Sequence, residues 1–214
     1  MRGFRVLWAA IVTASLILAA GVWLVREGHR TELPPQPTAA QMFSTSPKAT
    51  DQAAATPATP AMSASPPTRI RIRTIDVEAP VTPIGLDAKG QLQPPPPDNN
   101  NLVGWYQAGA APGQDGTAVM AGHVDNKRGL SVFYALGRLH PGAEVDIDRK
   151  DHTTAVFTVD AVEVYPKDHY PSDKVYGRTG RPELRLITCG GDFTKETGYQ
   201  GNVVAYAHLA RTET

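Results

Sequence analysis

A single cysteine, Cys189, is the residue best suited to covalent chemistry in this 214-residue chain. It ends an apolar run, residues 184–189 (LRLITC), and Gly190 and Gly191 follow it directly. A lone cysteine cannot form an intramolecular disulfide, so it is either a buried core residue or a reactive thiol. The two glycines favour a reactive thiol, because they let another backbone or a substrate approach closely.

A second apolar run, residues 117–122 (TAVMAG), ends in the same way at His123. Alone, His123 would be read as a hydrogen-bonded structural histidine. Two predicted strands that each end in a residue of catalytic type instead indicate a Cys-His pair, brought together in space. The remaining histidines show no metal-ligand spacing, so we expect no metal and no cofactor; they are His29, His140, His152, His169 and His208.

The elements that must position this pair have the pattern of short β-strands. Residues 69–75 alternate between polar and apolar, and residues 78–85 contain two prolines, which predicts a broken or edge strand. Residues 132–136 are predicted as one helical turn, and the prolines at 94–97 as a rigid loop. No long amphipathic helix is evident, so we expect an all-β barrel or sandwich of about eight strands. The other predicted strands are 117–122, 144–148, 155–159, 161–165, 184–189 and 202–209.

The N-terminal residues differ in composition from the rest of the chain. A basic start, which includes Arg2 and Arg5, precedes residues 6–25, which carry no charge. Twenty helical residues span about 30 Å, the thickness of the hydrocarbon core of a bilayer. We therefore expect a transmembrane anchor in residues 1–30, with the N-terminus in the cytoplasm and the rest outside the cell. A cleaved signal peptide is the alternative, which the length of the apolar run disfavours.

Residues 31–68 are rich in proline, alanine and threonine and contain few large apolar residues. Such a composition cannot offset the entropy of ordering, so we expect a disordered tether. Residues 69–214 then form the folded domain. The chain has 21 basic and 21 acidic residues, and this balance gives no reason to expect a nucleic-acid partner.

Several motifs in the folded domain together resemble the sortase family of surface transpeptidases, and most closely its actinobacterial class F. The most specific element is the LITCGG run combined with an upstream Gly-His. The resemblance covers roughly residues 69–209. The motifs are GWY at 104–106, GHVD at 122–125, VFY at 132–134, YPKD at 165–168, VYG at 175–177 and PELRLITCGG at 182–191.

The resemblance implies a closed sortase-type barrel and a role for each member of the pair. Cys189 is expected to form an acyl-enzyme, and His123 to protonate the departing amine and later deprotonate the incoming one. The implied partners are secreted proteins that carry a sorting signal, an amine of the cell-wall precursor, and the membrane through the N-terminal helix.

Sortases also use an arginine about a dozen residues after the cysteine, where this chain has Gln200, Gly201 and Asn202. Gln200 is a candidate for donating an amide hydrogen bond in its place. Arg185 is the best cationic candidate by strand parity, although four strand residues separate it from Cys189 by about 13 Å. Arg128, in the loop after His123, is a further candidate for an oxyanion or substrate contact.

Two rival functions remain open at this level. If water instead of an amine attacks the thioester, the protein is a thiol hydrolase. An inert Cys189 would make it a non-catalytic, extracellular wall-binding β-domain.

Overall fold

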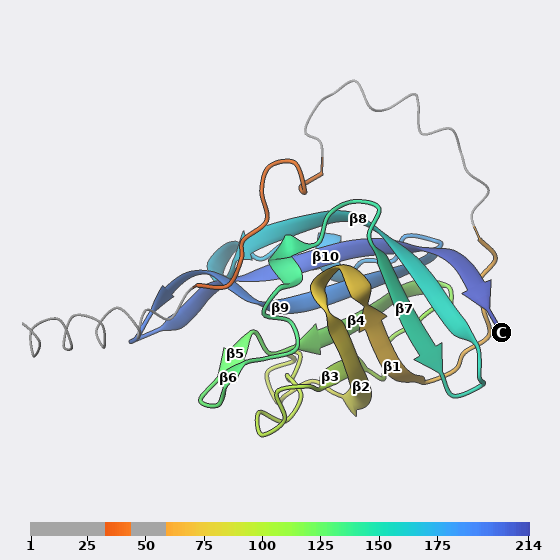
Figure 1. Cartoon of the computed structure of the whole chain (residues 1–214), viewed down its shortest axis with the longest axis horizontal. Coiled ribbons are helices and arrows are strands. Elements are labelled where there is room, and N and C mark those ends of the chain that lie inside the picture. The colour runs from red at the N-terminus through yellow and green to blue at the C-terminus, as the bar shows by residue number, and fades with distance from the viewer. Residues whose placement is uncertain (1–32, 44–58) are drawn as a thin grey trace, which may run out of the picture. The chain divides into compact units, whose positions relative to one another are not determined.

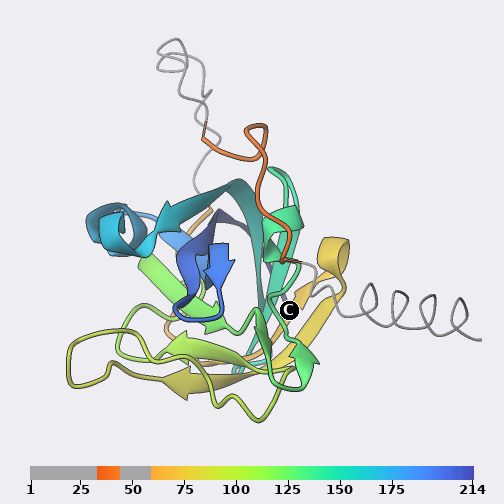
Figure 2. The same ribbon diagram turned by 90° about the vertical axis from the view of Figure 1, so that its left-hand side faces the viewer.

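A closed barrel of eight strands dominates the computed structural model, which describes residues 33–43 and 59–214 (Figure 1). The strands follow one another around the barrel in the order β1-β2-β3-β4-β9-β10-β8-β7. Figure 2, turned by 90°, shows these strands arranged around a common centre. The predicted all-β barrel of about eight strands with little helix is therefore confirmed.

The barrel strands alternate with short helical turns along the chain. The helical elements are η1 (Arg73–Ile75), η2 (Leu136–Arg138), η3 (Lys167–His169) and α2 (Ser172–Tyr176). A small ribbon, β5 (Asp125–Asn126) with β6 (Gly129–Leu130), lies outside the barrel sheet. The barrel strands are β1 (Pro67–Ile72), β2 (Val77–Ile84), β3 (Val103–Tyr106), β4 (Gly116–Gly122), β7 (Glu144–Arg149), β8 (Thr154–Pro166), β9 (Pro182–Thr194) and β10 (Gly198–Glu213).

The pairing of β2 agrees with the prediction of a broken or edge strand for residues 78–85. Its first half pairs with β1 and its second half pairs in parallel with β3, so each half has one partner strand among the described residues. Proline has no N–H to donate to a strand ladder, and the prolines of β2 lie opposite Arg69 and Trp105 in these one-sided pairings. The runs 155–159 and 161–165, predicted as two strands, are the single strand β8.

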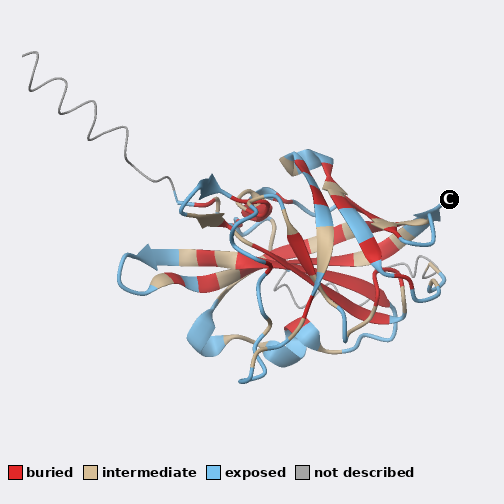
Figure 3. Ribbon diagram, turned by 90° about the horizontal axis from the view of Figure 1, so that it is seen from below, coloured by how far each residue is buried: buried red, intermediate tan, exposed pale blue. Residues whose placement is uncertain are grey.

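Two apolar clusters lie on opposite faces of the central strands. Alternate residues of β9 such as Leu184 and Leu186 point into the barrel, where Met120, Phe133 and Phe157 are also fully or almost fully buried. The intervening Ile187 packs outside the barrel in a second cluster with Val119, Val175, Val204 and Tyr206. The strand β4 is buried along its whole length, whereas β9 and β10 become exposed toward their C-terminal ends (Figure 3).

Residues 34–43 contact the barrel, although the sequence predicts a disordered linker there. The Gln41 amide donates to the carbonyl oxygens of Gly137 (2.8 Å) and Leu139 (2.5 Å), and the Val162 N–H donates to the Gln41 carbonyl (2.7 Å). The Phe43 ring meets the Tyr206 ring edge-on, with centroids 5.1 Å apart. This segment is held mainly by polar bonds to the barrel backbone, which an argument from apolar content does not anticipate.

The predicted membrane anchor, residues 6–25, lies outside the described residues. Within residues 33–43 and 59–214, no helix combines the length and the apolar character that crossing a bilayer requires.

Candidate active site

His123 directly follows β4 and is held at two points. Its Nε2 lies 2.8 Å from the carbonyl oxygen of Pro95, and its own carbonyl accepts a bond from the Phe133 N–H (3.1 Å). A carbonyl oxygen only accepts hydrogen bonds, so Nε2 must carry the proton in this contact. The neutral ring therefore has Nδ1 free of a proton, and the predicted proline loop sets the tautomer of the histidine.

Cys189 lies within β9 and not at its end, which corrects the sequence-based boundary. On one side β9 continues to pair with β10, where Cys189 is opposite Asn202. On the other side the parallel pairing with β4 stops at Ala121 and Ile187. Cys189 thus sits just beyond the point where one neighbouring strand ends, which leaves its side chain partly exposed on an otherwise continuous sheet.

A buried hydrogen bond ties together the residues that precede the two candidates. The Thr188 hydroxyl donates to the carbonyl oxygen of Gly122 over 2.8 Å. Extending the β4–β9 register by two residues would set His123 opposite Cys189, and adjacent strands are about 4.8 Å apart. The same parity directs both side chains to the outer face of the barrel.

Both side chains line one groove of about 1160 Å³ on that outer face. The groove has both apolar and polar lining residues. Its apolar wall includes Leu92, Tyr106, Val119, Ala121 and Ile187, and its polar residues include His123, Lys167, Cys189 and Asn202.

The glycines after Cys189 admit a neighbouring strand. A Cβ on Gly190 would lie 2.6 Å from a methyl carbon of Val203 on β10. Gly191 has a φ of +74°, and its N–H donates to the Gln36 side chain over 3.0 Å. The predicted close approach to the two glycines therefore occurs. The approaching residues are Val203 of β10 and Gln36 of the 34–43 segment.

The electrostatic surroundings of Cys189 act in opposing directions. Burial raises the pKa of the thiol, the charge of Lys167 lowers that pKa, and the charge of Asp125 raises it again; the net shift is upward. The free protein therefore holds this residue mainly as a thiol at neutral pH.

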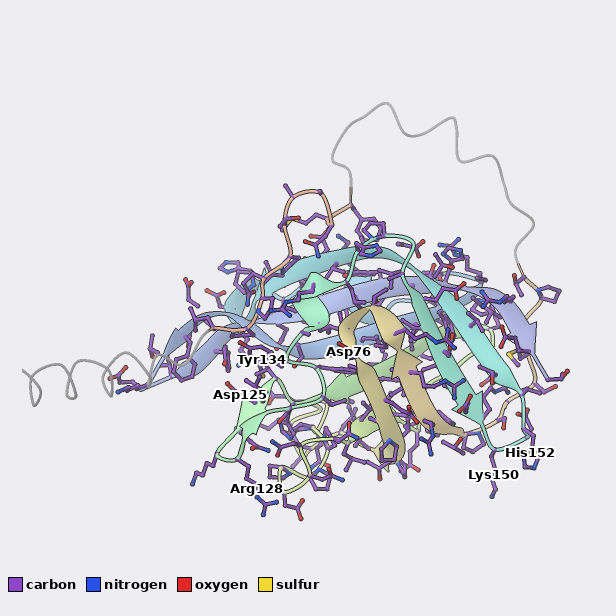
Figure 4. The ribbon with its side chains drawn as sticks, in the orientation of Figure 1. Asp76, Asp125, Arg128, Tyr134, Lys150 and His152 are labelled. Carbon is purple, nitrogen blue, oxygen red and sulfur yellow. The ribbon has the colours of Figure 1, made fainter. Side chains whose placement is uncertain are left out.

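The three other predicted site residues lie outside the groove lining. Arg185 is buried, donates to the Glu183 carboxylate (2.6 Å), and stacks on the Tyr206 ring with its guanidinium 4.5 Å from the ring centroid. Arg128 donates to the Asp98 carbonyl from the β5–β6 turn, where its side chain projects away from the barrel (Figure 4). Gln200 is exposed and donates to Thr197 and to the Gly198 carbonyl.

Two residues that the sequence left without a role do line the groove, Lys167 and Asn202. Asn202 falls within the expected spacing after the cysteine, so a strict cross-strand register would have identified it. Lys167 belongs to the YPKD motif, but it reaches the site from the far end of β8, which no local pattern reveals. Among the described residues, no group of His, Cys, Asp or Glu side chains is arranged to hold a metal ion.

Comparison with known proteins decides the family. The model of the sortase domain matches residues 70–210, about two thirds of the chain. The chain belongs to the sortase family. Members of this family are cysteine transpeptidases. A search of curated proteins gave no match.

Solved sortase structures of several classes share the fold. Sortase A of Listeria monocytogenes superposes with a TM-score of 0.51 at 19% identity, covering 71% of this chain and 90% of that one. A lid mutant of Corynebacterium diphtheriae sortase A gives 0.52 at 19% identity, covering 70% and 73%. Sortase C-1 of Actinomyces oris gives 0.51 at 20% identity, covering 67% and 73%.

Proposed function

We propose that this sortase cleaves a peptide sorting signal through a thioester on Cys189 and transfers the acyl group to an amine. The observation that carries this proposal is the placement of Cys189 and His123 on one groove, where the Thr188–Gly122 bond joins the end of β4 to the middle of β9. The apolar wall of the groove suits an extended peptide, whose side chains alternate between the wall and solvent.

The chemistry proceeds in two balanced steps. In the reactive state the Cys189 thiol proton has moved to Nδ1 of His123. The resulting thiolate attacks the scissile carbonyl carbon, the C–N bond breaks, and the His123 ring gives its Nδ1 proton to the departing amine. In the second step Nδ1 takes a proton from the incoming amine, whose nitrogen attacks the thioester. The C–S bond then breaks and the thiolate returns.

The experiment is a cleavage assay on a pooled library of quenched fluorescent pentapeptides, with and without hydroxylamine as the acceptor. Cys189→Ala is expected to abolish cleavage and Cys189→Ser to reduce it nearly as far, because a hydroxyl ionises far less readily than a thiol. His123→Ala is expected to bind the selected peptide without turning it over. His140→Ala, an exposed histidine outside the groove, is the control and should cleave normally.

The products separate the rival functions. Hydroxamate formation supports transfer, whereas free acid alone in the presence of hydroxylamine supports a hydrolase. Full cleavage by Cys189→Ala would overturn the proposal and return Cys189 to a structural role.

The finer class and the location are part of the proposal. The GWY, GHVD, VFY, YPKD, VYG and PELRLITCGG motifs support class F. The uncharged residues 6–25 after a basic start support a single-pass anchor with the catalytic domain outside the cell. A mature protein that is free in the medium and begins near Gly21 would show a cleaved signal instead.

A further inference from the structure

The proposed reaction places negative charge at two atoms, the Cys189 sulfur and the carbonyl oxygen of the tetrahedral intermediate. Donors or cations fixed at such atoms supply much of an enzyme's rate acceleration. The β10 residue opposite Cys189 is a neutral asparagine, Asn202. Arg185 is committed to Glu183, and Arg128 to a backbone carbonyl outside the groove.

Of the described residues, two cationic side chains line the groove, Lys167 and Arg178. Arg178 lies 3.9 Å from the carboxylate of Asp115, which immediately precedes β4. His123 follows the other end of β4, and a seven-residue strand is about 23 Å long. Arg178 therefore belongs to the end of the groove remote from the catalytic pair, and Lys167 remains as the cation at the catalytic end.

The fold fixes Lys167 at this place. Tyr165 and Pro166, the last residues of β8, pair with Asn202 and Gly201 of β10, so the chain delivers Lys167 beside the strand opposite Cys189. Its Nζ donates to the Tyr199 carbonyl over 2.7 Å. An ammonium group has three N–H donors, so the bond to Tyr199 leaves two of them for other acceptors.

Tyr199, which accepts the bond from Lys167, is itself held by a residue of a third element. The Tyr199 hydroxyl donates to the Asp125 carboxylate over 2.5 Å, and Asp125 lies only two residues after His123. The turn after β8, the start of β10 and the segment after β4 thus meet around the thiol. The ionisable groups that face Cys189 from these elements are Lys167, Tyr199, Asp125 and His123.

We propose that Lys167 is the catalytic cation of this centre, stabilising negative charge first on the Cys189 sulfur and then on the carbonyl oxygen of the acyl donor. The inference rests on the proposed function and names the residue that fills its missing cationic role. The charges near Cys189 agree with this inference, because the charge of Lys167 lowers the pKa of the thiol and the charge of Asp125 raises it.

The test measures the rate at which iodoacetamide alkylates Cys189 against pH in the full chain, which requires no peptide. Lys167→Met is expected to move the inflection to higher pH and slow alkylation below it by up to about tenfold, whereas Lys167→Arg restores the profile. Asp125→Asn is expected to move the inflection in the opposite direction. Lys150→Met, on the β7–β8 turn away from Asp125 (Figure 4), should leave the profile unchanged.

Peptide turnover supplies the second readout. Lys167→Met is expected to lower kcat by about 10²–10³-fold, the usual cost of one oxyanion donor, with a smaller change in KM. If folded Lys167→Met keeps the wild-type alkylation profile and kcat while Cys189→Ala is inactive, the inference about Lys167 is overturned and the proposed function stands. Cleavage by Cys189→Ala would instead overturn the proposed function.

Discussion

The hydrogen bond between Thr188 and Gly122 joins the strands that carry the candidate nucleophile and the candidate base. We expect Thr188→Val to weaken catalysis through this bond, because valine keeps the shape of the side chain and removes the donor. Thr188 is 4% exposed and its hydroxyl lies 2.8 Å from the Gly122 carbonyl oxygen. The net loss from one such bond is about 1 kcal/mol, which for a domain of this size lowers Tm by about 2–4 °C.

The effect on turnover should exceed what this stability change implies. Without this bond the end of β4 can move relative to β9 and the reacting groups can drift, and a misplacement of about 1 Å costs up to about 100-fold in rate. We therefore expect kcat to fall by at least about tenfold at a temperature where the protein remains folded. The assays are thermal denaturation and cleavage of a peptide selected from the pentapeptide library.

Thr59→Val is the matched control, since the Thr59 hydroxyl also donates to a backbone carbonyl, that of Ala210, over 2.6 Å. It should cost similar stability and leave kcat near that of the wild type. Equal kcat values for the two variants would refute the argument that the bond positions the catalytic pair.

Two further predictions concern the ionisable groups. Burial raises the pKa of the Cys189 thiol, so its alkylation by iodoacetamide should show an inflection above about 8.5 and proceed more slowly at pH 7 than that of free cysteine; an inflection below 8.5 would contradict this. Arg185→Ala should lower the free energy of unfolding by about 3 kcal/mol, because the buried Glu183 carboxylate loses a partner. Arg128→Ala should change it by less than about 0.5 kcal/mol, and equal denaturation midpoints would contradict this assignment.

The strand pattern predicted the barrel because most of its strands alternate or are continuously apolar. It placed Cys189 at a strand end because the residues that follow, such as Asp192 and Thr194, carry no apolar alternation. The β9–β10 hairpin extends through these residues by backbone pairing and by a contact between the Phe193 and Tyr199 rings across the two strands. The four-residue strand β3 was not predicted as a strand, since so short a run carries little periodicity.

Strand parity correctly placed Arg185 and Cys189 on one face of β9, but it did not show what covers that face. The Arg185 guanidinium stacks on the Tyr206 ring and pairs with the Glu183 carboxylate, so the Arg185 side chain does not reach the groove. Lys167 approaches Cys189 through the pairing of β8 with β10, a contact between residues distant in sequence. Local patterns pointed to the candidate nucleophile and the candidate base, whereas the position of the proposed cation depends on the closed topology of the barrel.

The central claim is that Cys189 carries the acyl group during the reaction. The most direct test is mass spectrometry of the wild-type protein mixed with the library-selected peptide in the absence of any amine. The account predicts an adduct on Cys189 with the mass of the acyl half of the peptide, which hydroxylamine then removes. Cleavage of the peptide without such an adduct, together with full activity of Cys189→Ala, would contradict it.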